Sequence, residues 1–481
     1  MNGLTTKVTT TVIWSAVEKF SVQGAQFVLT IFIARLVSPS DYGLIAMLQI
    51  FISIADTIID SGFSNALIHK KDRCDIDFST VFYFNILVGI SIYFLLYIFA
   101  NMIASFYGEP QLETLTKVVA LNVFFTSLTV IQRAKLAIAL NFRLLAFISF
   151  ISIIISGIIG IVLAYKGYGV WSLVVLTLLN NILITILLYI CVRWFPKLVF
   201  SWKSFKELFN FGSKLLLSGL LYTLYINMYN LIIGKKYSSV NLGFYNRAYS
   251  LAFFPSNNLS GIIVRAVYPI QCNMQDDAEK LSNFFLKSLR MSVYIIFPLM
   301  TLLFVLSKPV ILVLLTEKWL PIVELLQLMC LAFVWEPIMK MNNNILMVKG
   351  HADYLLKAEV LKKIVAIIIL LITLPLGLKN ICMGLILYSV FDVLIVTFYV
   401  KKAINITLIQ QMKSILILFF LSFIMGVCIY FLIQLVDLSW LQLLIGIIIG
   451  ITIYITLSFC FRIDETKIII LLWKNITKIF V

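Results

Sequence analysis

Residues 51 to 68 read FISIADTIIDSGFSNALI, a long apolar stretch that also holds two carboxylates, Asp56 and Asp60. On an α-helix, side chains three, four and seven residues apart share one face. The polar residues of the stretch keep this spacing: Ser53, Asp56, Thr57, Asp60, Ser61 and Ser64. Because a carboxylate at the centre of a bilayer costs roughly 2.5 to 3.5 kcal/mol, this face is predicted to line a protein interior or a water-filled cavity.

The composition of the chain is that of a polytopic membrane protein. Of its 481 residues, 62% are hydrophobic and 12% are charged, and the mean hydropathy is +1.03. Apolar runs of about 18 residues or more follow one another, which predicts transmembrane helices and excludes a soluble domain or a β-barrel. We expect an all-α protein with fourteen spans, near residues 12–36, 44–68, 78–104, 115–138, 144–165, 169–193, 210–234, 243–268, 283–306, 321–347, 355–376, 380–400, 412–434 and 439–461.

Residue types that carry catalysis or metal binding are sparse. The seven cysteines have no CxxC spacing, and the two histidines, His69 and His351, lie far apart. We therefore predict no disulfide and no metal site. The sequence contains no GxSxG, no HExxH and no phosphate-binding GxxxxGK[ST] motif, so it predicts no catalytic residue, no cofactor and no enzyme.

The formal net charge of +16 is explained by membrane topology. The basic residues gather at the ends of apolar segments and not in a patch interleaved with aromatic residues, so nucleic acid is not an expected partner. With the amino terminus in the cytoplasm, about 28 of the 38 Lys and Arg residues fall on the inside, as the positive-inside rule predicts. Both termini are then cytoplasmic.

A weak internal repeat divides the chain into two halves. LVSPSDYGL at 36–44 and KYSSVNLGF at 236–244 align Ser38 with Ser238 and Gly43 with Gly243, an offset of 200 residues. The halves are predicted to be six-helix bundles related by a pseudo-two-fold axis along the membrane normal. The predicted segments are a bundle at 1–195, an amphipathic interfacial linker at 196–209, a bundle at 210–402, two appended spans at 403–462 and an interfacial cytoplasmic tail at 463–481.

Four spans of the two halves carry polar residues at helical spacing and are predicted to line one cavity. The predicted substrate-binding residues are Lys19, Gln23, Gln26, Lys214, Tyr225, Arg247, Asn257, Asn258 and Arg265, with Glu18, Asp56 and Asp60 as acids among them. The bases suit a phosphate or pyrophosphate group. The alternative for any single residue is structural, since these groups could pair with one another, cap a helix or extend to the membrane interface. The sixth, thirteenth and fourteenth spans are nearly aliphatic and are expected to face lipid.

Several stretches together resemble one known family. They are IARLVSPSDYGLIAML (33–48), DSGFSNALI (60–68), KLVFSWKSFKELFNFGSKLLLSGLLY (197–222) and IIGKKYSSVNLGFYNRAYSL (232–251). The chain is similar over residues 10 to 460 to the bacterial polysaccharide transporters, the Wzx-like O-antigen and exopolysaccharide flippases of the MOP superfamily. Acids among the bases depart from the purely cationic cavity that the resemblance implies.

The resemblance implies a flippase in the bacterial inner membrane. It would move an undecaprenyl-pyrophosphate-linked oligosaccharide to the periplasmic leaflet for O-antigen, capsule or exopolysaccharide synthesis, by alternating access coupled to an ion gradient. Its partners would be that lipid, membrane lipids and the polymerase and chain-length machinery. Glu18, Asp56 and Asp60 would bind a coupling H⁺ or Na⁺ or orient the bases. The alternatives are a multidrug or solute exporter of the same superfamily and a membrane-embedded polymerase or ligase.

Overall fold

Two compact units divide the chain between Gly243 and Phe244. The computed structural model describes residues 22–60, 62–70 and 72–466, apart from the side chains of residues 211 and 214. All regular secondary structure in these residues is helical. The predicted all-α class is confirmed.

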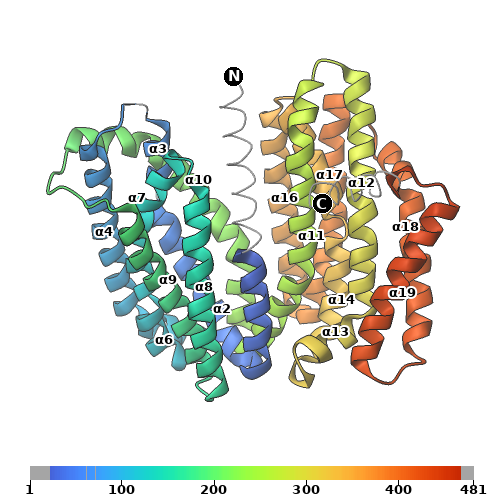
Figure 1. The fold of residues 1–481 in the computed structure, drawn as a ribbon, viewed down its shortest axis with the longest axis horizontal. Helices are drawn as coiled ribbons and strands as arrows, with labels where there is room; N and C mark the ends of the chain where they lie inside the picture. The colour runs from blue at the N-terminus through green and yellow to red at the C-terminus, as the bar shows by residue number, and fades with distance from the viewer. Residues whose placement is uncertain (1–21, 61, 71, 467–481) are drawn as a thin grey trace, which may run out of the picture. The chain divides into compact units, whose positions relative to one another are not determined.

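Unit 1 is a bundle of long helices (Figure 1). It contains a helix described from Val22 to Leu36, followed by α2 (Pro39–Asp60), α3 (Phe63–His69), α4 (Asp75–Ile98), α5 (Ala100–Tyr107), α6 (Gln111–Val119), α7 (Leu121–Ile138), α8 (Phe142–Tyr165), α9 (Val170–Val192) and α10 (Trp202–Lys236). Helices of 22 to 24 residues such as α2, α8 and α9 can cross a hydrocarbon core of about 30 Å. Within the unit, α2 packs against α7 and α10, α4 against α7, and α8 against α9.

The predicted span at 44–68 is two helices, because the chain breaks at Gly62. Gly62 has a φ of +68°, in the left-handed region that glycine adopts most readily. A β-carbon on Gly62 would lie 2.8 Å from the main-chain oxygen of Gly212 in α10. A glycine is therefore required both by the backbone angle and by the approach of α10.

The predicted linker at 196–209 is in large part the beginning of α10, which runs without interruption from Trp202 to Lys236. Its first turns pack on α3 and α4: the Ser204 hydroxyl donates to Asp77, and Leu208 is buried beside Phe63. Trp202 is exposed. By its packing α10 belongs to unit 1, so the division at Gly243 differs from the boundary predicted at residues 209 and 210.

Lys70, in the turn between α3 and α4, forms ion pairs with both α4 and α10. The ammonium of Lys70 lies 3.2 Å from an Asp77 oxygen and 3.0 Å from a Glu207 oxygen. Partial burial by itself would lower the pKa of Lys70, but the bonds to Glu207 and Asp77 outweigh it and raise that pKa. The start of α10 is therefore tied to α4 by charge as well as by apolar contact.

The two copies of the predicted repeat begin helices in the same way. The main-chain N–H of Asp41 donates to Ser38 Oγ at 3.2 Å, and that of Asn241 donates to Ser238 Oγ at 3.3 Å. The copies also pack on each other inside unit 1. A β-carbon on Gly43 would lie 1.7 Å from the main-chain oxygen of Ser239, and one on Gly243 would lie 2.0 Å from that of Pro39. The repeat therefore forms a reciprocal glycine crossing of α2 and α11.

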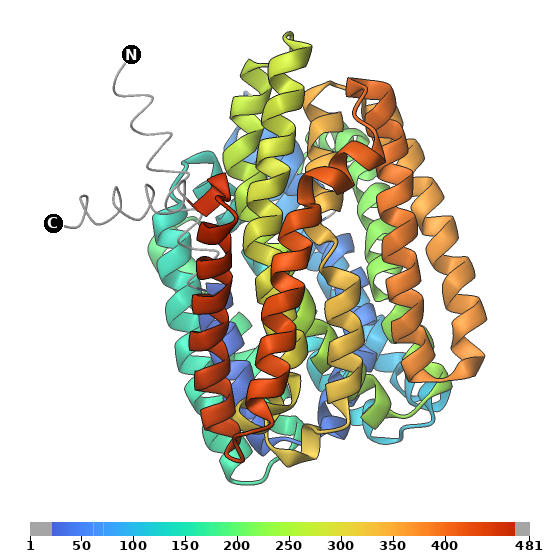
Figure 2. The ribbon, with the colours of Figure 1, turned by 90° about the vertical axis from the view of Figure 1, so that its right-hand side faces the viewer.

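Unit 2 holds the rest of α11 and the helices that follow it (Figure 2). Its helices are α11 (Ser239–Asn273), α12 (Ala278–Val305), α13 (Ser307–Leu314), η1 (Glu317–Trp319), α14 (Ile322–Phe333), α15 (Glu336–Val348), α16 (Ala352–Thr373), η2 (Leu374–Leu376), α17 (Leu378–Ile404), α18 (Leu408–Ile433) and α19 (Ser439–Cys460). In this unit α12 packs against α14 and α18, and α17 against α14 and α16.

The two appended helices, α18 and α19, pack against each other and are tied to α12. The Arg290 guanidinium binds both oxygens of Glu465, with Nε 2.6 Å from Oε1 and Nη2 3.0 Å from Oε2. A bidentate pair of this kind fixes geometry as well as charge. Residues 463–466 of the predicted tail are thus held against the bundle, and residues 467–481 lie outside the described part.

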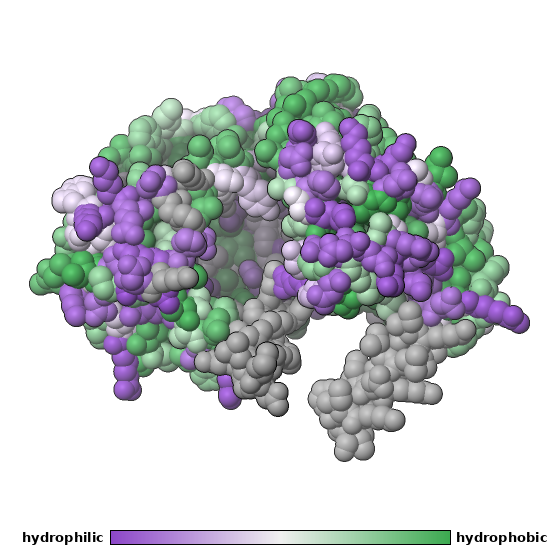
Figure 3. Space-filling model, turned by 90° about the horizontal axis from the view of Figure 1, so that it is seen from above, coloured by the Kyte–Doolittle hydropathy of each residue, from purple (hydrophilic) through white to green (hydrophobic). Residues whose placement is uncertain are grey.

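Each predicted span falls on one helix or on two consecutive helices. Eleven helices of the described residues are long and apolar enough to cross a membrane. The other three predicted spans correspond to the helix from Val22 to Leu36, which is shorter in the described range, and to α11 and α16, which carry more polar or charged residues. Figure 3 looks onto one end of each unit, where hydrophilic residues gather.

Candidate functional site

A polar cavity of about 890 Å³ lies inside unit 1. It is lined by residues of α2, α3, α7, α9 and α10 and of the α2–α3 turn, and twelve of its nineteen lining residues are polar. These are Asp56, Thr57, Asp60, Ser64, Asn65, Thr126, Thr129, Arg133, Asn181, Ser218, Tyr222 and Thr223. A polar lining inside a membrane-spanning bundle is costly unless it serves a ligand, water or an ion, so the cavity is the candidate functional site.

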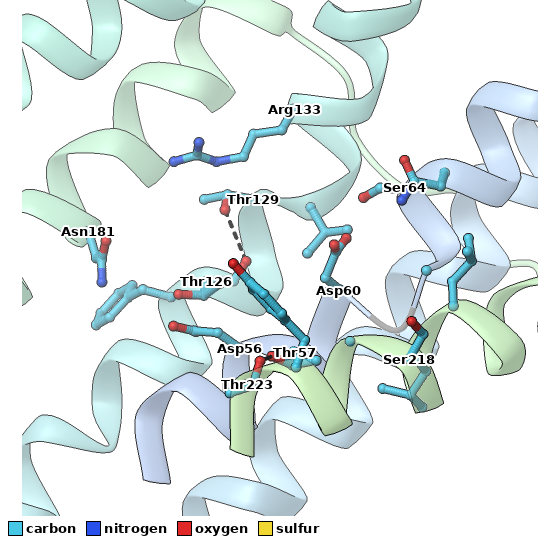
Figure 4. A pocket seen from close by; sticks show the side chains of 18 of the residues that line it. Asp56, Thr57, Asp60, Ser64, Thr126, Thr129, Arg133, Asn181, Ser218 and Thr223 are labelled. Carbon is cyan, nitrogen blue, oxygen red and sulfur yellow. Dashed lines mark hydrogen bonds between the residues drawn. The ribbon is translucent and has the colours of Figure 1, made fainter. Parts of the chain in front are cut away.

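The two aspartates of α2 line this cavity one helical turn apart (Figure 4). Asp56 is half-buried and Asp60 is exposed. Thr126 of α7 and Asp56 of α2 both line the cavity, and Asp56 Oδ1 accepts no hydrogen bond from the protein. The cavity therefore presents an acceptor oxygen that a ligand hydroxyl or a cation could use.

Helix α7 supplies the opposite charge. Thr126, Thr129 and Arg133 follow one another at three and four residues, so they share one face of α7. Figure 4 shows Arg133 and Asp60 extending into the same space from α7 and α2. The charge of Arg133 also acts on Asp56. Among the described lining residues Arg133 is the only base, so an anionic group entering the cavity would meet it.

Hydroxyl and amide groups complete the lining and tie the walls together. Thr57 and Thr223 join α2 to α10 through a hydroxyl contact of 2.9 Å. Asn181 of α9 donates its amide to Asn122 of α7 at 2.8 Å. Such neutral donors and acceptors, together with two carboxylates, can exchange hydrogen bonds with a ligand rich in hydroxyl groups. In the part of the chain that the structure describes, no group of three or more His, Cys, Asp or Glu side chains is placed to hold a metal ion.

The structure brings Asp56 and Asp60 together, as the helical spacing predicts. Gln23 is half-buried and Gln26 is exposed on the helix from Val22 to Leu36, and neither lines the cavity. Tyr225 does not line it either, whereas Tyr222, one turn earlier on α10, does. Glu18, Lys19 and the side chain of Lys214 lie outside the described residues.

The remaining predicted residues belong to unit 2. Arg247 is buried with its guanidinium 5.5 Å from the centre of the Trp319 ring. Arg265 is exposed. The side-chain oxygen of Asn257 accepts a hydrogen bond of 2.6 Å from the Lys340 ammonium. The side-chain amide of Asn258 donates a hydrogen bond of 3.0 Å to the main-chain oxygen of Phe254.

The sequence reasoning missed Thr126, Thr129, Arg133, Asn181 and Thr223. The three residues of α7 have the same helical spacing as the acids of α2, which was a usable signal. Arg133 was left out of the predicted site because basic residues were expected at the ends of apolar segments, but α7 continues from Arg133 to Ile138. Asn181 lies on a span expected to face lipid, and this expectation is wrong at Asn181, which lines the cavity.

A family model for polysaccharide biosynthesis proteins matches residues 32–324, more than half of the chain. The chain belongs to this family. The chain is 25% identical over 413 residues to the lipopolysaccharide biosynthesis protein WzxC of Escherichia coli K12, and the match covers 85% of this chain and 84% of WzxC. The family predicted from the sequence is confirmed.

Comparison with solved structures identifies the fold of this chain. The chain superposes on the lipid II flippase MurJ in an inward closed conformation with a TM-score of 0.77 and 18% identity, covering 94% of this chain and 99% of MurJ. An inward-facing multidrug resistance MATE transporter of the MOP superfamily matches with a TM-score of 0.61 and 14% identity, covering 82% of this chain and 98% of the transporter. The chain therefore has the fold of these two solved structures.

Proposed function

We propose that this protein is a flippase that moves a lipid-linked oligosaccharide across the bacterial inner membrane for the synthesis of a surface polysaccharide. The proposal rests on the polar cavity of unit 1. This cavity is a hydrophilic space between helices that are long enough to span a bilayer. The family membership and the fold shared with the lipid II flippase support it. The carrier would be undecaprenyl pyrophosphate, and the product would pass to a polymerase and its chain-length machinery.

The chemistry of the cavity suggests where each part of the lipid-linked oligosaccharide would bind. Sugar hydroxyls would donate to Asp56 and Asp60 and exchange hydrogen bonds with the threonine, serine and asparagine groups of the lining. The pyrophosphate would bind Arg133, since guanidinium groups match phosphate oxygens in charge and geometry. Lys19, Lys214, Arg247 and Arg265 stay as predicted further contacts for the pyrophosphate. The polyprenyl tail would remain in lipid.

Neutralising Arg133 tests the proposal. Arg133→Gln removes a charge-assisted phosphate contact worth about 1.5 to 3 kcal/mol, so we expect display of the surface polysaccharide to fall roughly tenfold or more. The measurement is complementation of a flippase-deficient strain, with membrane levels of the protein quantified in parallel. Arg143→Gln is the matched control, because Arg143 begins α8 and does not line the cavity. Normal display by Arg133→Gln would reject Arg133 as the phosphate contact.

A multidrug or solute exporter is the second candidate, because a MATE transporter shares the fold. The same expression strains separate the two functions. A flippase restores surface polysaccharide and leaves the drug susceptibility of an efflux-deficient strain unchanged. An exporter lowers that susceptibility and leaves the polysaccharide defect in place.

A further inference from the structure

A group of charged side chains lies inside unit 2, on helices that do not form the unit 1 cavity. At its centre is Lys362 of α16, whose side chain is 3% exposed. Its ammonium lies 3.3 Å from Asp392 Oδ1 of α17 and is bound by Glu359, one turn earlier on α16. Lysine is almost never buried to this degree unless it is paired. The question is what the buried ammonium does between two carboxylates.

The positive and negative charges around Lys362 balance. Asp392 and Lys362 both act electrostatically on Glu336 of α15, and Lys340 lies 3.8 Å from Glu336. Lys363 lies 3.5 Å from Glu359. Three carboxylates (Glu336, Glu359 and Asp392) thus face three ammonium groups (Lys340, Lys362 and Lys363) in the described residues. Removal of Lys362 would leave a deficit of one positive charge, which a single monovalent cation would fill.

The ion pair of Lys362 and Asp392 depends on charge and does not include a directed hydrogen bond to Asp392 Oδ1. Asp392 is more than nine-tenths buried, yet its Oδ1 accepts no hydrogen bond, although the Lys362 ammonium is 3.3 Å away. A cation without N–H donors could therefore replace the ammonium and keep the interaction with Asp392.

We propose that Lys362 is a resident cation: its ammonium fills a carboxylate site that would otherwise take a monovalent metal ion such as Na⁺. As long as Lys362 is present, unit 2 has no need of a free Na⁺ at this place. Cutting the side chain back to alanine would remove the charge and open the space, which converts the group into a Na⁺ site. This inference does not depend on the transport function, because it concerns binding and stability alone.

The test compares melting temperatures of the purified full-length protein in NaCl and in choline chloride at equal ionic strength. The wild type should melt at the same temperature in both salts. Lys362→Ala should melt lower in choline, because it leaves the buried carboxylate of Asp392 without its cation and removes one of the two ammonium groups that bind Glu359. It should recover by about 3 °C or more in NaCl, because an ion that binds only the folded state stabilises that state.

Three variants make the result specific. Lys363→Ala loses the same charge from a half-buried neighbour and should show no Na⁺ effect. Lys362→Met loses the charge but fills the space, so it should melt lower in both salts without recovery. Adding Asp392→Asn to Lys362→Ala should abolish the recovery, because it removes the carboxylate from α17. Lys362→Ser repeats the test if Lys362→Ala fails to fold.

Three outcomes would overturn the proposal. A Na⁺-specific rise in the melting temperature of the wild type would mean that the site binds free Na⁺ with Lys362 in place. A Lys362→Ala protein that is stabilised by lower pH equally in both salts would mean that a carboxylate takes up a proton and that no metal site opens. Equal melting of that variant in both salts at every pH would likewise reject it.

Discussion

At the scale of single residues, the cavity of unit 1 owes its character to three charges. Asp56 is half-buried and holds an oxygen that accepts no hydrogen bond from the protein, whereas Asp60 is exposed at the end of α2. Arg133 faces them from α7. Two carboxylates one turn apart in a polar cavity offer several oxygen ligands to a cation. The pair is therefore our proposed coupling site, with orientation of the bases as the alternative.

Asp60→Asn separates coupling from orientation. If Asp60 carries the coupling ion, transport by the variant in vesicles should lose its response to an imposed pH or Na⁺ gradient, a loss of about fivefold or more. Transport without a gradient should be little changed. Asp72→Asn is the control, because Asp72 is an exposed acid of the α3–α4 turn. A variant that still responds fully to the gradient would remove Asp60 from coupling and favour the orienting role.

At the scale of elements, helical spacing predicted the acidic side of the site, whereas the positive-inside rule led us to miss the basic residue on α7. The spacing of α2 placed Asp56 and Asp60 on one face, and both line the cavity. The same spacing in α7 was passed over because the positive-inside rule explained Arg133 as a terminal charge. A rule that accounts for a residue by its place in the bilayer gives no information on which way its side chain points.

The start of α10 shows a second limit of sequence reasoning. The amphipathic pattern at 196–209 indicates an interface helix, because an apolar face next to basic residues suits a membrane surface. In the structure part of that face packs on α3 and α4 through Ser204 and Leu208, and no proline stops the helix before Lys236. Burial against protein and burial in lipid leave the same pattern, so only tertiary contacts could tell them apart.

The reciprocal crossing of α2 and α11 gives the prediction at this scale. Gly43→Ala and Gly243→Ala each place a β-carbon against a main-chain oxygen, so each should cost about 1 to 3 kcal/mol and lower the melting temperature. The double variant should lose less than the sum of the two, because the first methyl group already separates the helices. Gly24→Ala is the control, since a β-carbon there meets nothing within 4 Å.

Strict additivity of the two substitutions would contradict this prediction. It would mean that the two glycines act at independent places, and that the matching caps of Ser38 and Ser238 do not mark one shared crossing. An unchanged melting temperature for both single variants would contradict the close approach itself.

At the scale of the whole molecule, the bias of the charges predicts how the chain lies in the membrane. The turn that holds Cys74, between α3 and α4, is predicted to be cytoplasmic, and the turn that holds Leu438, between α18 and α19, is predicted to be external. The third to the thirteenth predicted spans separate them, which is an odd number. These two positions should therefore label from opposite sides of the membrane.

Both positions can be reached by a thiol reagent, since Cys74 and Leu438 are exposed. In a background without the other six cysteines, Cys74 should react with a membrane-impermeant maleimide only in inverted vesicles. In a background without all seven, Leu438→Cys should react only from the periplasmic side, in osmotically opened cells. Labelling after denaturation controls for the amount of protein. The reverse pattern would invert the chain, and labelling of both from one side would break the parity of fourteen spans. The predicted pattern would support an odd number of spans between the two positions and a cytoplasmic α3–α4 turn, on the side where the proposed flippase would receive its cargo.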